Sequence, residues 1–119
     1  MTSSEVCLVM TDEAVMAQDI ALTLSDRFGS VPVILARTPA EALAQLEPVD
    51  RVLVAVADLS PEDFASSPLA HAVTARNGKV VLITDTEDLA EDLALPFTVL
   101  DRPFRSRMLL EVLPRREME

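Results

Sequence analysis

Short apolar runs alternate along the chain with segments in which apolar residues recur every three or four positions. Five of these runs have the length of a β-strand and little polar content, at residues 6–10, 31–35, 52–57, 80–83 and 97–100. The run at 52–57 is continuous, which is typical of a strand that is buried on both faces of a sheet. The pattern therefore predicts five strands separated by helical segments.

The first two helical segments have clear start and stop residues. The first segment is expected to end at Gly29, because glycine readily adopts the left-handed conformation that follows many helices. The second opens with Thr38-Pro39-Ala40-Glu41, in which threonine is a preferred cap, proline fits the first turn and glutamate closes a capping box. The residues predicted to face inward are Ala17, Ile20, Ala21, Leu24 and Phe28 in the first helix, and Ala42, Leu43 and Leu46 in the second.

The later helical segments are less regular. Ser60-Pro61-Glu62-Asp63 caps a third helix that runs to Asn77-Gly78, and we expect Pro68 to split it. A short fourth helix begins at Thr86 and ends before Pro96. The last helix contains Met108, Leu109 and Val112.

Strict alternation of strands and helices predicts an α/β fold. With connections of this length, right-handed crossovers place helices on both faces of a doubly wound, five-stranded parallel sheet of the flavodoxin-like (βα)5 type. The chain has 119 residues, half of them hydrophobic, which is enough for one compact core. We therefore expect residues 1–119 to form a single domain without an output domain.

Composition narrows the classes of partner. Ten basic and twenty acidic residues give a formal net charge of -10, so the surface should repel phosphate backbones, and nucleic acid is not expected as a partner. No apolar run approaches the roughly 20 residues of a membrane span, so we expect a soluble, cytoplasmic protein. The lone cysteine, Cys7, lies in the first apolar run and is expected to be a small buried hydrophobe.

Parallel α/β sheets place their functional sites at the carboxyl ends of the strands. The polar residues in those places are Thr11-Asp12-Glu13 after the first strand, Asp58 after the third, Thr84-Asp85 after the fourth and Asp101-Arg102 after the fifth. The candidate chemistry of the chain is therefore carboxylates, two hydroxyl groups and one guanidinium.

Arg102-Pro103-Phe104, directly after the fifth apolar run, resembles the Lys-Pro-Phe signature of response-regulator receiver domains, the CheY-like family. The other strand ends match the same family pattern in order and nearly in spacing, over essentially the whole chain. In that family an acidic pair and an aspartate hold a divalent cation, and a histidine kinase or a phosphotransfer protein supplies the phosphoryl group that the aspartate accepts. A Thr or Ser and the lysine contact the phosphoryl oxygens. Magnesium suits such a site because it prefers carboxylate and phosphate oxygens.

The resemblance assigns roles to individual residues of this sequence. Asp12, with Glu13 and Asp58, supplies the candidate Mg²⁺ ligands, and Asp58 is the candidate phosphoacceptor. Thr84 and Arg102 are the candidate contacts to the phosphoryl group. The resemblance also implies a cis peptide bond between Arg102 and Pro103.

The sequence departs from the family pattern at several of these positions. The first acid falls on Thr11, which predicts weakened Mg²⁺ binding. Counting from Asp50 or from Pro61 puts the phosphoacceptor on Ala57, and only a slip of one residue puts it on Asp58.

Further departures concern the other strand ends. Asp85 sets a carboxylate beside Thr84, where the family has a small residue. Arg102 has a planar guanidinium group in place of the compact ammonium group of lysine. Val99 occupies the position at which the family often has a Tyr or Phe that changes orientation on phosphorylation.

Each candidate also has a simpler structural interpretation. Asp12 and Glu13 suit the start of the first helix, and Asp58 suits a turn. Thr84 suits a strand end at which the backbone satisfies its hydroxyl group. We favour Arg102 as an ion-pair partner of nearby carboxylates such as Asp58 or Asp12. The lone histidine, His71, is expected to be an ordinary position on the third helix.

Only 18 positions separate Thr84 from Arg102, whereas receivers have about one helical turn more, roughly four residues. The fourth helix is therefore expected to be shortened. In the family this helix belongs to the face that binds partners, so an exposed apolar patch there would suit a signalling partner or a homodimer contact.

The sequence favours a stand-alone receiver-like protein of two-component signal transduction. We expect it to act by protein–protein interaction, with a degenerate phosphorylation site and without enzymatic turnover. The alternative is a functional receiver phosphorylated on Asp58. A second alternative is a small-ligand domain of the flavodoxin-like type. The loop Thr11-Asp12-Glu13 lacks glycine and the chain lacks Trp and Tyr, which argues against a bound flavin.

Overall fold

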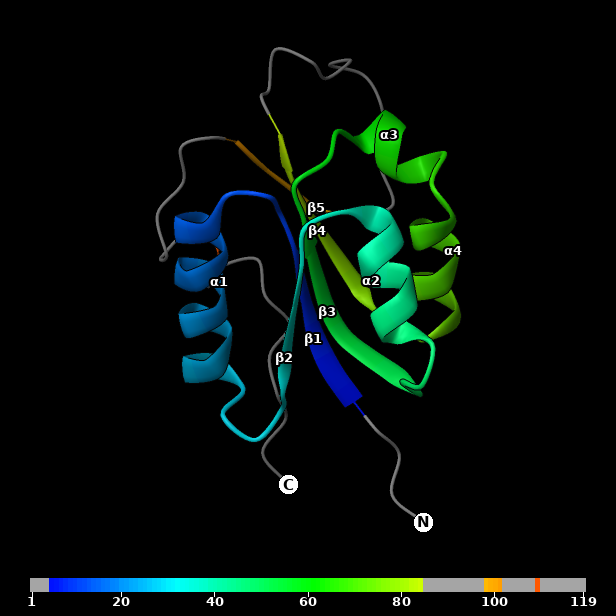
Figure 1. The fold of residues 1–119 in the computed structure, drawn as a ribbon. Helices are drawn as coiled ribbons and strands as arrows, with labels where there is room; N and C mark the ends of the chain where they lie inside the picture. Colours follow the sequence, from blue (N-terminus) through cyan, green and yellow to red (C-terminus); the bar gives the residue numbers. More distant parts are fainter. Residues whose placement is uncertain (1–4, 85–97, 102–108, 110–119) are drawn as a thin grey trace.

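A computed structural model describes residues 5–84, 98–101 and 109 of the chain. In it a twisted sheet runs through the middle of the molecule, with α1 on one face and α2 and α4 on the other (Figure 1). The elements in chain order are β1 (Glu5–Met10), α1 (Ala14–Arg27), β2 (Val33–Ala36), α2 (Pro39–Leu46), β3 (Arg51–Ala57), α3 (Pro61–Ala65), α4 (Pro68–Ala75), β4 (Lys79–Thr84) and β5 (Thr98–Asp101).

The strands pair in parallel in the order β2-β1-β3-β4-β5. From β1 the chain passes to β2 at one edge and then crosses to β3 on the other side of β1. The direction of winding therefore reverses between β1 and β3, and ligand sites of such sheets lie at this reversal. The predicted parallel, doubly wound α/β architecture is confirmed.

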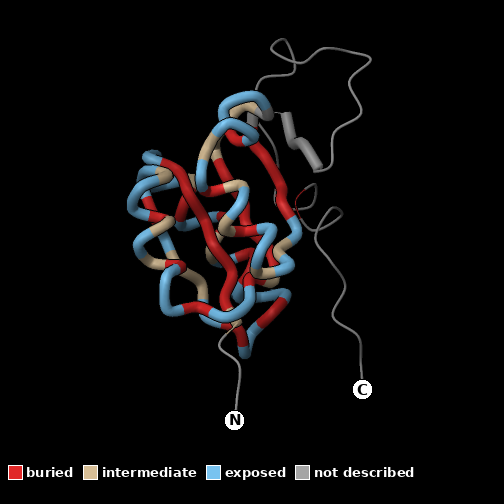
Figure 2. The backbone as a smooth tube through the Cα atoms, turned by 90° about the vertical axis from the view of Figure 1, so that its right-hand side faces the viewer, coloured by how far each residue is buried: buried red, intermediate tan, exposed pale blue. Residues whose placement is uncertain are grey.

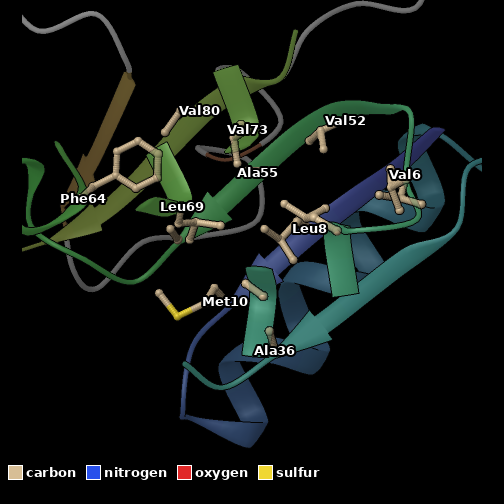
Figure 3. Packing of buried hydrophobic residues seen from close by; sticks show 14 of the residues in the cluster. Val6, Leu8, Met10, Ala36, Val52, Ala55, Phe64, Leu69, Val73 and Val80 are labelled. Carbon is tan, nitrogen blue, oxygen red and sulfur yellow. The ribbon is translucent and has the colours of Figure 1, made fainter. Parts of the chain in front are cut away.

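Alternate residues of β1, β3 and β4 point to opposite faces and fill two cores. On β3, Ala55 and Ala57 pack on the side of α2 and α4, whereas Val54 and Val56 pack on the side of α1. Figure 2 shows the buried residues following the inner strands, with exposed residues on the outer surface. Figure 3 shows the first core, in which side chains from β1 and β3 meet those of α3, α4 and β4.

The inward faces predicted for the first two helices are confirmed. The predicted residues are buried or half-buried: Ala17, Ile20, Ala21, Leu24 and Phe28 on α1 and just after it, and Ala42, Leu43 and Leu46 on α2. Helix α1 ends at Arg27, and Gly29 follows without a positive φ angle, so the left-handed role expected for this glycine is wrong.

Helix α2 begins at the predicted cap with one difference. The Thr38 hydroxyl accepts the Glu41 N–H at 3.1 Å, as expected for an N-cap. The Glu41 carboxylate, however, accepts the N–H of Arg37 at 3.2 Å, one residue before the position that a capping box requires.

Pro68 splits the third helical segment as predicted. Ser60 caps α3 by accepting the Asp63 N–H at 3.1 Å, and α4 begins with Pro68 in its first turn. Asn77, with a φ of 60°, takes the left-handed conformation after α4. Gly78 follows in a crowded position, since a Cβ atom there would lie 2.6 Å from Val73 Cγ1 and 2.9 Å from Val52 Cγ1.

Strand β2 occupies Val33–Ala36 instead of the predicted residues 31–35. The Val31 N–H donates to Phe28 O at 2.8 Å in the turn after α1, and Pro32 has no N–H to donate. Ladder pairing with β1 therefore starts later along the chain. At the outer side of β2, Gln45 Nε2 donates to the carbonyl oxygen of Leu35 at 2.8 Å.

Some predictions fall outside the described residues. They include the shortened fourth helix and most of the last helix, of which Leu109 alone is described, as a helical and fully buried residue. Within the described ranges, no helix combines the length and the apolar character needed to cross a bilayer.

Candidate functional site

The ends of β1 and β3 lie side by side where the winding of the sheet reverses. Met10 is paired with Ala57, and the Asp58 N–H donates to Met10 O at 2.8 Å, which continues the ladder past the end of β3. Thr11 and Asp58 therefore follow neighbouring strands at the same level.

The side chains of Ala57 and Asp58 point in different directions. Ala57 is fully buried in the core beneath α2 and α4. Asp58 is half-buried, and its Oδ2 accepts a hydrogen bond of 2.9 Å from Thr11 Oγ1. Of these two residues, Asp58 thus supplies the carboxylate at the strand edge, one residue after the position that spacing from Pro61 indicated.

Thr11 is a buried polar residue with 4 % of its surface exposed. Its hydroxyl group donates to Asp58 and accepts the Glu13 N–H at 3.2 Å. The sequence identified Thr11 only as a missing acid and did not identify it as the partner of Asp58. Its place directly after β1, level with Asp58 after β3, is the signal that could have revealed the pair.

Asp12 and Glu13 are both exposed. Glu13 is the N-cap residue of α1, but its side chain makes no capping hydrogen bond, and the first turn of α1 contains no acidic residue. Both residues directly precede α1, where the helix dipole favours negative charge. This position agrees with their simpler structural interpretation, although the Glu13 side chain does not cap the helix.

The described residues do not fit the Mg²⁺ site that the family resemblance implied. No group of three or more His, Cys, Asp or Glu side chains among them could hold a metal ion. At the edge of β1 the carboxylate that would face Asp58 is replaced by a neutral hydroxyl group that donates to it. A hydroxyl proton directed at Asp58 satisfies one of its lone pairs without adding a positive charge.

The remaining candidates are placed only in part. Thr84 is the last residue of β4 and pairs with Asp101 of β5. Because Leu82 pairs with Ala57, Thr84 lies one residue further along its strand than the level of Asp58. Arg102, its ion pair, its peptide bond to Pro103, and Asp85 lie outside the described residues. His71 is an exposed position on α4, as expected.

A groove of about 200 Å³ adjoins the Thr11 side of the site, between the start of α1 and the ends of β1 and β2. It is open to solvent, and Thr11, Asp12, Gln18 and Arg37 contribute its polar groups together with Glu41. The sequence did not point to Gln18 or Arg37.

The chemistry available at this edge is that of a hydrogen-bonded carboxylate. Phosphorylation of Asp58 would place a dianion beside Thr11 and close to exposed Asp12, so its charge would need neutralisation by a cation. Transfer of a phosphoryl group depends mainly on such neutralisation and on positioning. At this edge the described residues supply one carboxylate, which a neutral hydroxyl group holds by a hydrogen bond.

Comparisons with known proteins agree on the fold. A scan against protein-family models finds no match, and a search of curated proteins finds no relative. Among solved structures, the chemotaxis response regulator CheY4 of Vibrio cholerae is similar, with a TM-score of 0.65 and 22% sequence identity over 92% of this chain and 95% of that chain.

Two further solved structures have the same architecture. A response regulator receiver protein from Sinorhizobium medicae has a TM-score of 0.61 and 22% identity over 93% of this chain and 91% of that chain. A response regulator receiver domain protein from Clostridium thermocellum has a TM-score of 0.59 and 19% identity over 92% of this chain and 90% of that chain. The chain thus has the flavodoxin-like fold of receiver domains.

Proposed function

We propose that this chain is a receiver-like protein of two-component signal transduction that acts by protein–protein interaction and has a degenerate phosphorylation site. The fold shared with receiver domains supports the class of protein. The hydrogen bond from Thr11 to Asp58 supports the degenerate site, because a hydroxyl group stands where a receiver has an acid that holds the cation. This hydrogen bond is the observation that carries the proposal.

The proposal includes the class of partner and the compartment. The partner is a histidine kinase, a phosphotransfer protein or another signalling protein that recognises the folded surface, and self-association as a homodimer is a further mode of contact. The formal net charge of -10 argues against nucleic acid as a partner. We place the protein in the cytoplasm and assign it no enzymatic turnover and no required Mg²⁺.

One observation favours a second candidate function, a working receiver phosphorylated on Asp58. The Asp58 side chain, and not that of Ala57, lies at the strand edge and is half-buried, so a carboxylate remains within reach of a phosphodonor. In this alternative the Thr11 hydroxyl would have to release Asp58 Oδ2 or turn to a different acceptor.

Phosphorylation by a small donor distinguishes the two candidates. The protein is incubated with Mg²⁺ and acetyl phosphate, and its intact mass is followed with time. We expect no saturable phosphoryl adduct, because the cation that would neutralise the transferred group is poorly held. Asp63→Ala serves as the matched control, since it removes an exposed carboxylate from α3 and leaves Asp58 in place.

A saturable adduct that Asp58→Ala abolishes and Asp63→Ala retains would overturn the degenerate-site proposal in favour of the working receiver. Beryllofluoride, a mimic of the phosphoryl group, gives an independent check through the backbone amide signals near Asp58.

A further inference from the structure

Thr11 joins two parts of the structure that are distant in sequence. Through its hydroxyl group it donates to Asp58 Oδ2 at the end of β3, at 2.9 Å, and it accepts the Glu13 N–H at the start of α1, at 3.2 Å. A threonine hydroxyl has one proton, so its direction toward Asp58 leaves the oxygen lone pairs for Glu13. The two hydrogen bonds are therefore linked through a single atom, Thr11 Oγ1.

The burial of Thr11 makes this linkage strong. Only 4 % of Thr11 is exposed, so the hydroxyl group that both hydrogen bonds share is itself largely shielded from water. Hydrogen bonds in a chain polarise one another, and they are stronger where the local dielectric constant is low. A change at the Asp58 carboxylate thus alters the capacity of Thr11 Oγ1 to accept from Glu13.

The Glu13 N–H belongs to the residue that directly precedes α1. Glu13 is the N-cap residue, and its own side chain makes no capping hydrogen bond. The backbone here begins the helix whose first turn carries Val15, with 74% of its surface exposed. A perturbation of the Glu13 amide therefore reaches a solvent-facing helix turn directly.

From this geometry we infer that Thr11 is a positioning residue that couples the state of the Asp58 carboxylate to the first turn of α1. The inference rests on the proposed function, because it concerns the regulation of the same site. A phosphoryl group on Asp58 Oδ2, or a hydrogen-bond donor from a partner, would displace the hydrogen bond that Thr11 donates to this oxygen. The change at Thr11 Oγ1 then alters its hydrogen bond with the Glu13 N–H at the start of α1.

Backbone amide shifts of the ¹⁵N-labelled chain test the coupling. Asp58→Ala is introduced into the wild-type chain and into a Thr11→Val background, in which the hydroxyl group is lost and the side-chain shape is kept. We expect Asp58→Ala to shift the Glu13 amide in the wild type and to leave it nearly unmoved in the Thr11→Val background. Thr11→Ser, which keeps the hydroxyl group, should preserve the response.

A matched control comes from a second buried threonine. Thr23 is 8 % exposed, and its hydroxyl group donates to Asp19 O within α1 at 3.0 Å. Thr23→Val should leave the response of Glu13 to Asp58→Ala unchanged. Urea unfolding of the same variants gives the coupling between positions 11 and 58, which we expect to be roughly tenfold in the unfolding equilibrium constant for a hydrogen bond to a carboxylate.

Two results would overturn the inference: an equal Glu13 shift in the Thr11→Val background, or no Glu13 shift in the wild type. If the double variant fails to fold, Asp58→Asn replaces Asp58→Ala in the wild type and in the Thr11→Val background, because it keeps the side-chain shape, and the Glu13 amide shift is compared in the same way. Failure of this inference and failure of the proposed function give different results, because a phosphorylated Asp58 would overturn the degenerate site while leaving the coupling through Thr11 intact.

Discussion

Position 11 illustrates what a single residue reveals before and after its surroundings are known. The sequence predicted the loss of an acid at Thr11 and the weakening of a cation site. It did not predict that the same side chain donates to Asp58, because that contact depends on the register between β1 and β3, in which Met10 pairs with Ala57. Register between strands is set by packing and connections far from the local pattern.

The same register explains the uncertainty over the carboxylate. Spacing within one sequence could not decide between Ala57 and Asp58, since a slip of one residue reverses the face of the sheet. Burial distinguishes them, because Ala57 fills the core under α2 and α4 while Asp58 is half-buried and accepts a hydrogen bond from Thr11. The assignment of chemical roles to Thr84 and Arg102 stays a prediction.

Thr11→Asp is expected to make the stability of the protein depend on Mg²⁺. The substitution replaces a hydrogen-bond donor by a third carboxylate next to Asp58 and Asp12, so charge repulsion should destabilise the fold without a cation. Saturating Mg²⁺ should restore about 1 to 3 kcal/mol by binding only the folded state. Thermal unfolding with and without millimolar Mg²⁺ measures this effect.

The wild type serves as one control and should show little dependence on Mg²⁺. Thr11→Asp combined with Asp58→Asn is a second control and should lose most of the Mg²⁺ effect. A Thr11→Asp variant that folds and yet responds to Mg²⁺ no more than the wild type would contradict the expectation.

At the scale of elements, the starts of helices were the most predictable features. Thr38 and Ser60 cap α2 and α3 because capping is a contact within four residues, which the sequence displays directly. The start of β2 was misplaced, since it depends on the turn from Phe28 to Val31 after α1. Helix ends were harder still, as Asn77 and not a glycine takes the left-handed position.

At Gly78, in the junction between α4 and β4, even a methyl side chain should destabilise the fold. A Cβ atom there would lie 2.6 Å from Val73 Cγ1 and 2.9 Å from Val52 Cγ1, so Gly78→Ala forces two buried side chains to move. We expect a loss of about 1 to 3 kcal/mol in the free energy of unfolding, as for other overpacked sites. Urea denaturation measures the loss.

Gly29→Ala is the matched control for this substitution. Its added Cβ atom would meet Ser25 O at 3.4 Å, an ordinary contact, and Gly29 has no positive φ angle to strain. This variant should be neutral or slightly more stable. Equal effects of the two substitutions would show that backbone entropy, and not crowding at Gly78, governs both.

For the whole molecule, the order of apolar runs was sufficient to predict the architecture. Runs buried on both faces require helices on both sides, and strict alternation leaves few topologies other than a parallel doubly wound sheet. The two cores that result meet this requirement, one under α1 and one under α2 and α4. The architecture alone does not predict the function, because one fold supports many activities.

Leu109 tests whether the molecule behaves as one cooperative unit. It is fully buried among residues from β1, β3, β4 and α1, although it lies far from most of them in sequence. Leu109→Ala should lower the free energy of unfolding by about 2 to 5 kcal/mol through lost burial and a cavity. Urea denaturation followed by circular dichroism should still show a single transition.

Leu22→Ala is the control at the other extreme, because 70% of Leu22 is exposed on α1 and its truncation should change stability little. If Leu109→Ala were equally harmless, the C-terminal part of the chain would contribute little to the core on the α1 side.

The hydrogen bond from Gln45 to Leu35 affects how the edge of the sheet can pair with other molecules at high protein concentration. Strand β2 lies at an edge of the sheet, and since Pro32 and Ala36 direct their carbonyl groups toward β1, that of Leu35 faces outward. An outward carbonyl beside an apolar side chain is a template on which the strand of another molecule can grow into a fibril. Gln45 Nε2 already donates a hydrogen bond to this carbonyl oxygen. The glutamine side chain therefore blocks the acceptor that a strand of a second molecule would need in order to pair with β2 there.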